Sequence, residues 1–260
     1  MRILVTFALE AEFAPWRAMH RFRPATWGAA SVQFAEIGGA EVGVILTGVG
    51  PRQAALEASR VAWGGPGSLE FCVSAGLAGA LRPEYRIAQV LAARAVMTEN
   101  PQLGGESSVL DCSAALVSFA ADCKATPVDR FYSANHVVAT APEKKRLGEL
   151  ADAVEMESFE ILRRARTGGI PAIAIRAISD AADEDLPLDM NEIFTDEGQV
   201  SIPRVLGQVA LHPSALPGLL KLGQKSKQAA ESLAAFLNRY IATLADRAET
   251  LESKSWVAAE

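Results

Sequence analysis

The sequence has few cysteines, few aromatic residues and no long apolar run. Its 260 residues include three cysteines (Cys72, Cys112 and Cys123), none in CxxC spacing, and 7% aromatic residues. An odd number of scattered cysteines argues against a disulfide framework and a metal site, so we expect reduced core thiols. No apolar run reaches the roughly 18 residues of a membrane-spanning helix, and none is predicted.

The sequence also lacks an excess of positive charge. Its 25 Lys and Arg face 31 Asp and Glu, for a formal net charge of −6. A nucleic-acid-binding domain needs a basic face, so no nucleic acid is expected as a partner. The opening MRILVTFALEAEF places carboxylates where a signal peptide needs an uninterrupted apolar stretch, and we expect a cytoplasmic protein.

Half of the residues are hydrophobic, and no repeat, linker or low-complexity segment interrupts the chain. A chain of this length can form one large core. We therefore predict a single domain over residues 1–247, followed by a flexible tail at 248–260.

The pattern alternates apolar runs with amphipathic stretches. Strands are expected at 2–8, at 71–74, at 87–96, within 129–140 and at 173–178, with a hairpin over 31–50 that turns at Gly38-Gly39. Helices are expected at 11–19, from Pro51 onward, at 113–124, at 157–166 and at 219–246. Strands that alternate with helices predict a three-layer α/β domain.

Polar and glycine residues follow several of these strands. They lie in ALEAE (8–12), TGVG (47–50), SAG (74–76) and SD (179–180), and EME (155–157) opens a helix. Ligands of open α/β sheets bind at the carboxyl ends of the strands. Each segment alone has a structural explanation, such as a tight turn or a helix cap, but their joint placement predicts a site.

Several alternative chemistries find no support in the motifs. Gln53 stands where a dinucleotide fingerprint beginning at Gly48 and Gly50 needs a third small residue. There is no Walker loop, no G-x-S-x-G and no H-E-x-x-H. The three histidines lack metal-ligand spacing, although His136 could still be catalytic.

Two motifs carry a family resemblance. Val154-Glu155-Met156-Glu157, followed by Arg176-Ala177-Ile178-Ser179-Asp180, resembles the nucleoside phosphorylase/nucleosidase family, which includes methylthioadenosine/S-adenosylhomocysteine nucleosidases and purine nucleoside phosphorylases. ALEAE, TGVGPRQA and SAGLAGAL occur in the same order as in that family. The segment after Asp183 is similar to the branch called hopanoid-associated phosphorylases or adenosylhopane nucleosidases.

The resemblance implies a three-layer α/β/α fold around a twisted mixed sheet, and cleavage of the N-glycosidic bond of a purine ribonucleoside. It makes Asp180 the general acid at purine N7, oriented by Ser179, and Glu12 the residue that activates water. The implied substrate-binding residues are Glu157 and Met156 at the ribose, Ser74 and Gly76 at the nucleophile, Gly48 in its turn, and Val137 and Val138 at the base, where nucleosidases often place an aromatic residue.

Glycosidic cleavage passes through an oxocarbenium-like sugar, which a carboxylate stabilises, and the leaving base must receive a proton. We expect hydrolysis of a 5′-modified adenosine without a cofactor. The alternatives are a phosphorylase that takes inorganic phosphate as co-substrate, with Arg52 as the local cation, and a nucleoside-binding protein without catalysis. A homo-oligomer is expected, with a dimer as the first choice.

Residues 202–222 are rich in leucine and interrupted by Pro203, Pro213 and Pro217. The prolines predict short helical pieces. These leucines either cap the domain core or form an apolar lid over the 5′ end of the nucleoside, where a lipid-linked nucleoside could bind.

Overall fold

Strand β10 (Ala172–Asp180) lies at the centre of the structure, and all nine of its residues are buried. Its apolar run AIAIRAISD pairs in parallel with β5 (Phe71–Ala80) and antiparallel with β6 (Val90–Asn100). A strand enclosed by neighbours and covered by helices needs side chains that favour burial on both faces, which explains why its sequence is apolar apart from Arg176, Ser179 and Asp180.

The computed structural model describes residues 1–64, 69–100, 106–195 and 197–257. For residues 100, 106 and 247–257 it describes the backbone only. Within these residues, ten strands form one mixed sheet. The remaining strands are β1 (Arg2–Phe7), β2 (Arg23–Trp27), β3 (Ala30–Ile37), β4 (Ala40–Leu46), β7 (Glu106–Asp111), β8 (Thr126–Ser133) and β9 (Ala153–Glu155).

The sheet closes partly on itself. Its strands follow the order β10-β6-β8-β9-β5-β1-β4-β3-β2, and β10 also pairs with β5. The strands from β10 to β5 therefore form a closed ring, while β1 to β4 extend it as an open sheet. β7 pairs with β6 outside this path.

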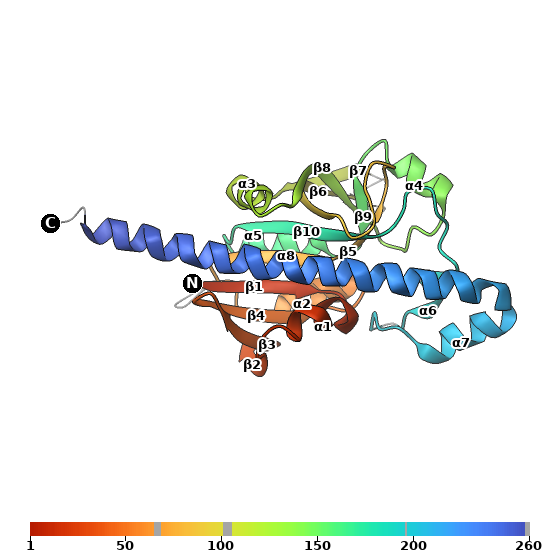
Figure 1. Cartoon of the computed structure of the whole chain (residues 1–260), viewed down its shortest axis with the longest axis horizontal. Helices are drawn as coiled ribbons and strands as arrows, with labels where there is room; N and C mark the ends of the chain where they lie inside the picture. Colours follow the sequence, from red (N-terminus) through yellow and green to blue (C-terminus); the bar gives the residue numbers. More distant parts are fainter. Residues whose placement is uncertain (65–68, 101–105, 196, 258–260) are drawn as a thin grey trace.

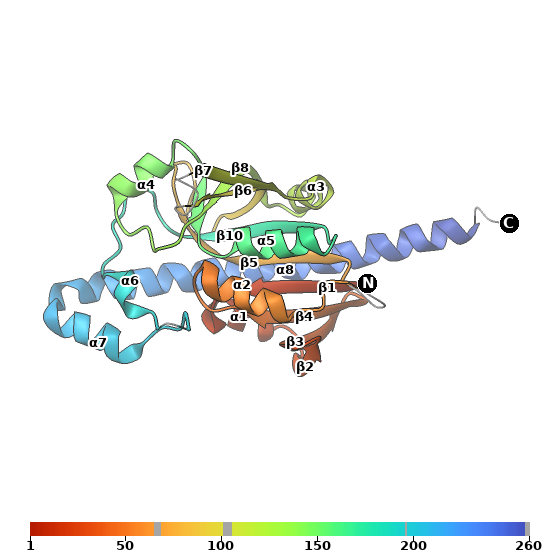
Figure 2. The ribbon, with the colours of Figure 1, turned by 180° about the vertical axis from the view of Figure 1, so that it is seen from behind.

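Helices cover both faces of the sheet, as the three-layer α/β/α prediction requires. α8 (Leu216–Val257) crosses one face and contacts β10, β5 and α1 (Glu10–Arg17) (Figure 1). α2 (Pro51–Arg60) and α5 (Ser158–Thr167) pack together on the opposite face (Figure 2). α3 (Ala114–Asp122) lies against β6 and β8, and α4 (Ala141–Leu147) follows β8 in the chain.

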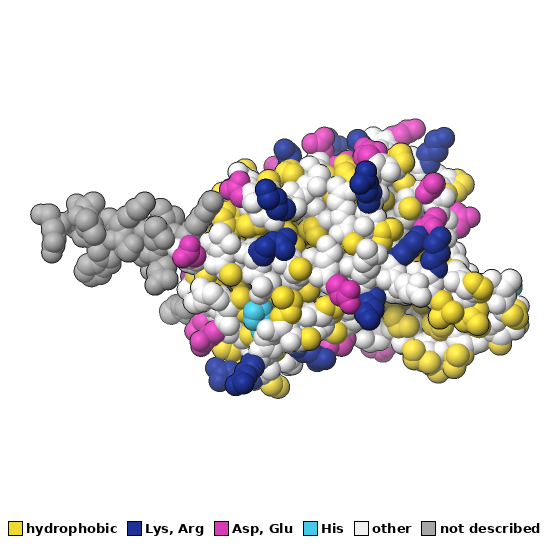
Figure 3. All heavy atoms as spheres, viewed as in Figure 1, with side chains coloured by type: hydrophobic (Ala, Val, Ile, Leu, Met, Phe, Trp, Pro, Cys, Tyr) yellow, Lys and Arg dark blue, Asp and Glu magenta, His cyan; other side chains and the backbone are white. Residues whose placement is uncertain are grey.

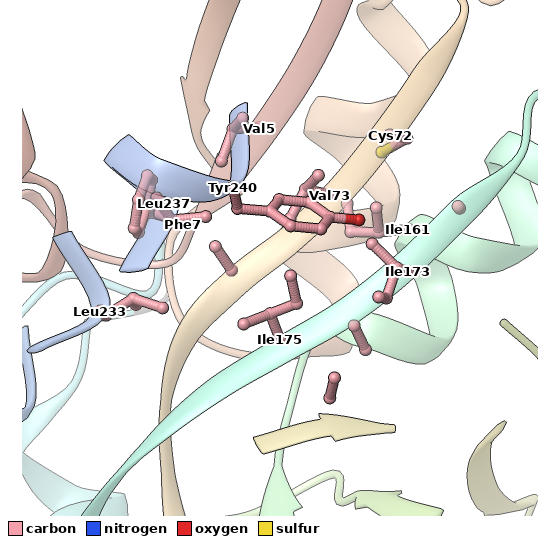
Figure 4. Close-up of a cluster of buried hydrophobic side chains, with 14 of the residues drawn as sticks. Val5, Phe7, Cys72, Val73, Ile161, Ile173, Ile175, Leu233, Leu237 and Tyr240 are labelled. Atoms are coloured by element: carbon pink, nitrogen blue, oxygen red, sulfur yellow. The ribbon is translucent and has the colours of Figure 1, made fainter. Parts of the chain in front are cut away.

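The main core forms where α8 meets the central strands. Leu233, Leu237 and Tyr240 of α8 point toward β5 and β10 (Figure 4). All three are fully buried, and the Tyr240 hydroxyl donates to the carbonyl of Leu116 at 3.1 Å. The buried phenol thus has a hydrogen-bond partner, which removes the main cost of placing it there.

The hairpin prediction is confirmed, since β3 and β4 pair antiparallel around Gly38 and Gly39, both with positive φ. The expected end of the strand at Ser74 is wrong. β5 continues to Ala80, because its small residues fit between the paired strands β10, β1 and β9. Ser74 and Gly76 therefore lie inside a strand.

The segment after β10 contains α6 (Met190–Ile193), α7 (Ile202–Leu211) and the short 3₁₀ helix η2 (Pro213–Ala215) before α8 begins. The backbone of α8 continues to Val257; the tail predicted at 248–260 has no described side chains, and 258–260 lie outside the described residues. No described helix combines the length and the apolar character that crossing a membrane requires.

Candidate active site

A cavity of about 200 Å³ opens where β5, β9 and β10 approach α1 and α6. Seven of the residues predicted from sequence line it: Glu12, Val137, Val138, Met156, Glu157, Ser179 and Asp180. Ser74, Gly76 and Gly48 do not line it. Segments separated by more than 150 residues thus meet at one place, and the three predicted carboxyl side chains line the same cavity together with Glu155.

Glu12 is held at the start of α1 by backbone N–H groups. Its Oε2 accepts from Ala8 (2.9 Å) and Leu9 (3.1 Å), and its Oε1 accepts from Leu77 (3.0 Å). Burial raises the pKa of Glu12, while these backbone donors and the Arg176 charge act in the opposite direction. A buried carboxyl with a raised pKa is suited to accept a proton from water.

Gly76 lies directly beneath Glu12. A Cβ at this position would come within 3.2 Å of Glu12 Oε1. Gly76 therefore contributes by its lack of a side chain, which lets the carboxyl approach the strand.

Glu157 is joined to the turn before α2. The Gly50 N–H donates to Glu157 Oε1 at 2.8 Å, and Gly50 has φ +100°, a conformation that favours glycine. Gly48, with φ +76°, lies earlier in the same turn. The turn at 47–50 thus holds a carboxylate of the cavity.

Burial raises the pKa of Glu157 to about 8, with a further contribution from the negative charge of Glu155. The Arg176 guanidinium opposes this rise, with Nη2 3.8 Å from Glu157 Oε2. A carboxyl poised near neutrality can either donate to or accept from a sugar hydroxyl.

Arg176 is the buried cation beneath the cavity. Its Nη2 lies 2.5 Å from Glu155 Oε2, and its Nη1 donates to the carbonyl of Ser74 at 2.8 Å. The Ser74 hydroxyl lies 3.0 Å from the Ser158 hydroxyl, so Ser74 contacts both Arg176 and Ser158 and helps to hold the guanidinium in place. Sequence analysis placed Arg176 and Glu155 in the two motifs of the resemblance but assigned neither a role in the site, although a charge inside the apolar run of β10 was the available signal for Arg176.

Asp180 ends β10 with both carboxyl oxygens engaged. The Ser179 hydroxyl donates to Oδ1 at 2.7 Å, and Lys144 Nζ donates to Oδ2 at 2.6 Å. Lys144 on α4 is fully buried and also donates to the carbonyls of Ala181 and Glu184, each at 2.9 Å. No sequence pattern indicated Lys144, because it reaches Asp180 only through the packing of α4 against the end of β10.

The mouth of the cavity is apolar. Val137 and Val138 lie there with Leu222, the last residue of the leucine-rich segment predicted as a possible lid, and with three residues that sequence analysis missed: Leu186, Met190 and Phe194. Asn191 joins two sides of the mouth, because its Oδ1 accepts from Val137 N–H (2.7 Å) and its Nδ2 donates to the Val137 carbonyl (3.2 Å). Phe194 and Met190 provide large faces that a planar or aliphatic group could contact.

Among the described residues, no group of three or more His, Cys, Asp and Glu is arranged to hold a metal ion. His136 lies at the rim, where its Nε2 is 3.0 Å from Glu143 Oε1 and its Nδ1 is 2.8 Å from Asn135 Oδ1.

Comparison with known proteins agrees with this arrangement. The model of the phosphorylase superfamily matches residues 2–209. A comparison with curated proteins found no match.

Many solved structures share the fold. The 5′-methylthioadenosine/S-adenosylhomocysteine nucleosidase from Helicobacter pylori, with butyl-thio-DADMe-Immucillin-A, is 18% identical, with a TM-score of 0.71. The match covers 93% of this chain and 97% of that nucleosidase. The native futalosine hydrolase of the same organism is 17% identical, with a TM-score of 0.70. The match covers 93% of this chain and 97% of the hydrolase. The 5′-methylthioadenosine/S-adenosylhomocysteine nucleosidase from Neisseria meningitidis, in complex with methylthio-immucillin-A, is 18% identical, with a TM-score of 0.69. The match covers 93% of this chain and 99% of that nucleosidase.

Proposed function

The chain belongs to the phosphorylase superfamily and is an enzyme that cleaves N-glycosidic bonds, and we propose that it hydrolyses this bond in a 5′-modified adenosine, releasing the free base. The observation that carries the hydrolytic assignment is the charge of the cavity. Glu12, Glu155, Glu157 and Asp180 line it, and no Lys or Arg is among its described lining residues.

Asp180 serves as the general acid. Asp180 acts in its protonated form: as the C1′–N9 bond breaks, the purine becomes basic at N7 and takes the proton of the Asp180 carboxyl. The proton that Glu12 takes from water is returned to Asp180 through solvent after each turnover. Ser179 and Lys144 support the carboxylate that remains, because the hydroxyl and the ammonium donate to its two oxygens. Met156 and Glu157 hold the ribose, and the Glu157 carboxyl exchanges hydrogen bonds with the sugar hydroxyls as positive charge develops on the sugar.

Glu12 serves as the base that activates water. It takes one proton as the water oxygen bonds to C1′, so the products are the free base and a 5′-modified ribose. The backbone N–H groups of Ala8, Leu9 and Leu77 orient its oxygens, and Gly76 leaves room for them. No cofactor is needed for these steps.

Phosphorolysis is the alternative for the same fold. A bound phosphate requires cationic groups, whereas Arg52 is exposed and is not among the lining residues. A carboxylate at the nucleophile position repels phosphate, which favours water. A nucleoside-binding protein without catalysis is disfavoured by the presence of the three predicted carboxyl side chains at one cavity.

The apolar mouth supports a substrate with an apolar 5′ substituent, and a lipid-linked nucleoside is the extreme member of this class. Leu186, Met190, Phe194 and Leu222 line the cavity on the side of α6 and α8. Burial of a chain contributes about 0.8 kcal/mol per CH₂, so even a few contacts can determine specificity. We place the enzyme in the cytoplasm as a homodimer.

The test is adenine release from 5′-methylthioadenosine and adenosine, with and without phosphate. We expect release without phosphate, and kcat/KM that rises as the 5′ substituent becomes longer and more apolar. A strict phosphate requirement would identify a phosphorylase, and no release from any nucleoside would leave a binding protein. A flat or falling series would restrict the enzyme to small 5′ substituents.

A further inference from the structure

The segment from 201 to 228, which we call the α7–α8 hairpin, projects from one end of the molecule (Figures 1 and 2). It contains α7, η2 and the first three turns of α8. Every one of its residues is exposed or partly exposed, and Ala229 is the first buried residue on α8. The leucines of this segment therefore do not cap the domain core, and burial within this chain does not explain its apolar sequence.

Large apolar side chains are concentrated on this hairpin. Ten are strongly exposed among the residues whose side chains are described. Five of them lie on the hairpin, namely Ile202, Leu206, Leu211, Leu216 and Leu220, and a sixth, Val200, directly precedes it. Figure 3 shows the resulting apolar surface at the end of the molecule that carries α6 and α7. A contiguous surface of this kind marks a binding interface.

The charge of the hairpin differs from that of the rest of the chain. Between 198 and 230 there is no Asp or Glu, and there are four cations: Arg204, Lys221, Lys225 and Lys227. The chain as a whole has a formal charge of −6. Glu184, which precedes the segment, pairs with both Lys221 and Lys225. Lys227 approaches Glu231, which lies just after the segment, at 3.9 Å.

Lys221 and Lys225 are set back from the start of α8, whereas Arg204 lies on α7 between Ile202 and Leu206. With a rise of 1.5 Å per residue, Lys221 lies about 8 Å and Lys225 about 14 Å along α8 from Leu216. This spacing matches a bilayer surface, where apolar side chains enter the headgroup and acyl boundary while lysines remain at the level of the phosphates. A second copy of this chain fits less well, because symmetric pairing of two such hairpins brings like charges together.

We propose that the α7–α8 hairpin docks on an anionic lipid surface, with the leucines of α7 and of the start of α8 inserted among the lipids and the basic residues at the headgroups. This inference stands on the exposed side chains and their charge, independently of the reaction. One consequence does rest on the proposed function. Leu222 of the hairpin also lines the mouth of the cavity, so docking turns the mouth toward the source of an apolar 5′ chain.

The experiment is flotation of the full chain with vesicles of phosphatidylcholine, with or without phosphatidylglycerol. We expect the wild type to float with the anionic vesicles and to be released by high salt. The double variant Leu206→Glu/Leu211→Glu should bind at least about tenfold more weakly, because two charges replace inserted side chains. Leu56→Glu is the matched control, since Leu56 is 47% exposed but lies on α2, and it should bind like the wild type.

Circular dichroism and adenine release from soluble methylthioadenosine should be unchanged in the double variant, because neither leucine is buried or lines the cavity. Vesicle binding is measured without nucleoside, so its failure is separate from a failure of the proposed reaction. The proposal is overturned by a wild type that stays in solution with every vesicle, or by equal loss of binding in the double variant and Leu56→Glu. A dimer that the double variant abolishes, without vesicle binding, would show instead that the surface contacts a second copy.

Discussion

The ammonium of Lys144 lies 2.6 Å from Oδ2 of Asp180, inside the protein and on a helix that the sequence around Asp180 does not indicate. The two residues are 36 positions apart. Lys144 also donates to the carbonyls of Ala181 and Glu184, the first and the fourth residue after β10. The same side chain thus orients the carboxyl and fixes the segment that leaves the site.

Loss of this lysine should lower the stability of the folded protein. Lys144→Met leaves Asp180 without its buried partner, and removal of one member of a buried pair costs about 3–5 kcal/mol. The double variant Lys144→Met/Asp180→Asn should recover much of that stability, because the unpaired charge is gone. Urea unfolding of the four members of this cycle measures the coupling, and additive effects would contradict the pairing.

Replacement of the acid should remove catalysis while the fold is kept. Asp180→Asn retains the shape of the side chain and cannot protonate the base, so kcat should fall about 10²-fold or more. Adenine release measures the rate, and circular dichroism checks that the variant is folded. Turnover close to that of the wild type would show that the proton comes from elsewhere.

The Glu12 carboxyl should be required for attack by water. Glu12→Gln keeps the side-chain length but removes the base, and we expect phosphate-independent release to fall about 10²-fold or more. The assay compares reactions with and without added phosphate. Activity that survives the substitution and needs phosphate would make the enzyme a phosphorylase.

The folded protein should become less stable as pH rises, because of Glu157. Its pKa is raised to about 8 from an ordinary value of 4.5, so between these values the folded state holds a proton that the unfolded chain has lost. The free energy of unfolding therefore decreases as pH rises through this window. Glu157→Gln removes this contribution, and its stability curve between pH 5 and pH 8 should be flatter than that of the wild type. Parallel curves would contradict the raised pKa.

The approach of Asp180 to the sheet should depend on a glycine. A Cβ at Gly79 would lie 2.8 Å from Asp180 Oδ2 and 3.3 Å from Val154 Cγ1, so Gly79→Ala should displace the carboxyl and lower kcat about tenfold or more. Gly223→Ala is the control, because a Cβ there meets nothing within 4 Å, and it should leave kcat unchanged. Equal activities in the two variants would show that Asp180 tolerates the shift.

Parts of the site could be predicted because they depend on local sequence. The two motifs at 154–157 and 176–180 identified Met156, Glu157, Ser179 and Asp180, and all four line the cavity. Glu12 was found because it follows a short buried strand at the start of α1. The role of Gly48, Gly76 and Ser74 in support of other residues could not be read from sequence, because it depends on which strands lie next to them.

The sequence by itself determined the elements whose causes are local. A continuous apolar run predicted the central strand β10, and the glycine pair predicted the hairpin turn, because hydrophobic pattern and positive φ depend on a few adjacent residues. Only the tertiary structure decided that β5 continues past Ser74, that Lys144 reaches Asp180, and that the leucines of the α7–α8 hairpin remain exposed. Strand length, buried charge pairing and exposure depend on neighbours that are distant in the chain, and packing alone brings these neighbours together.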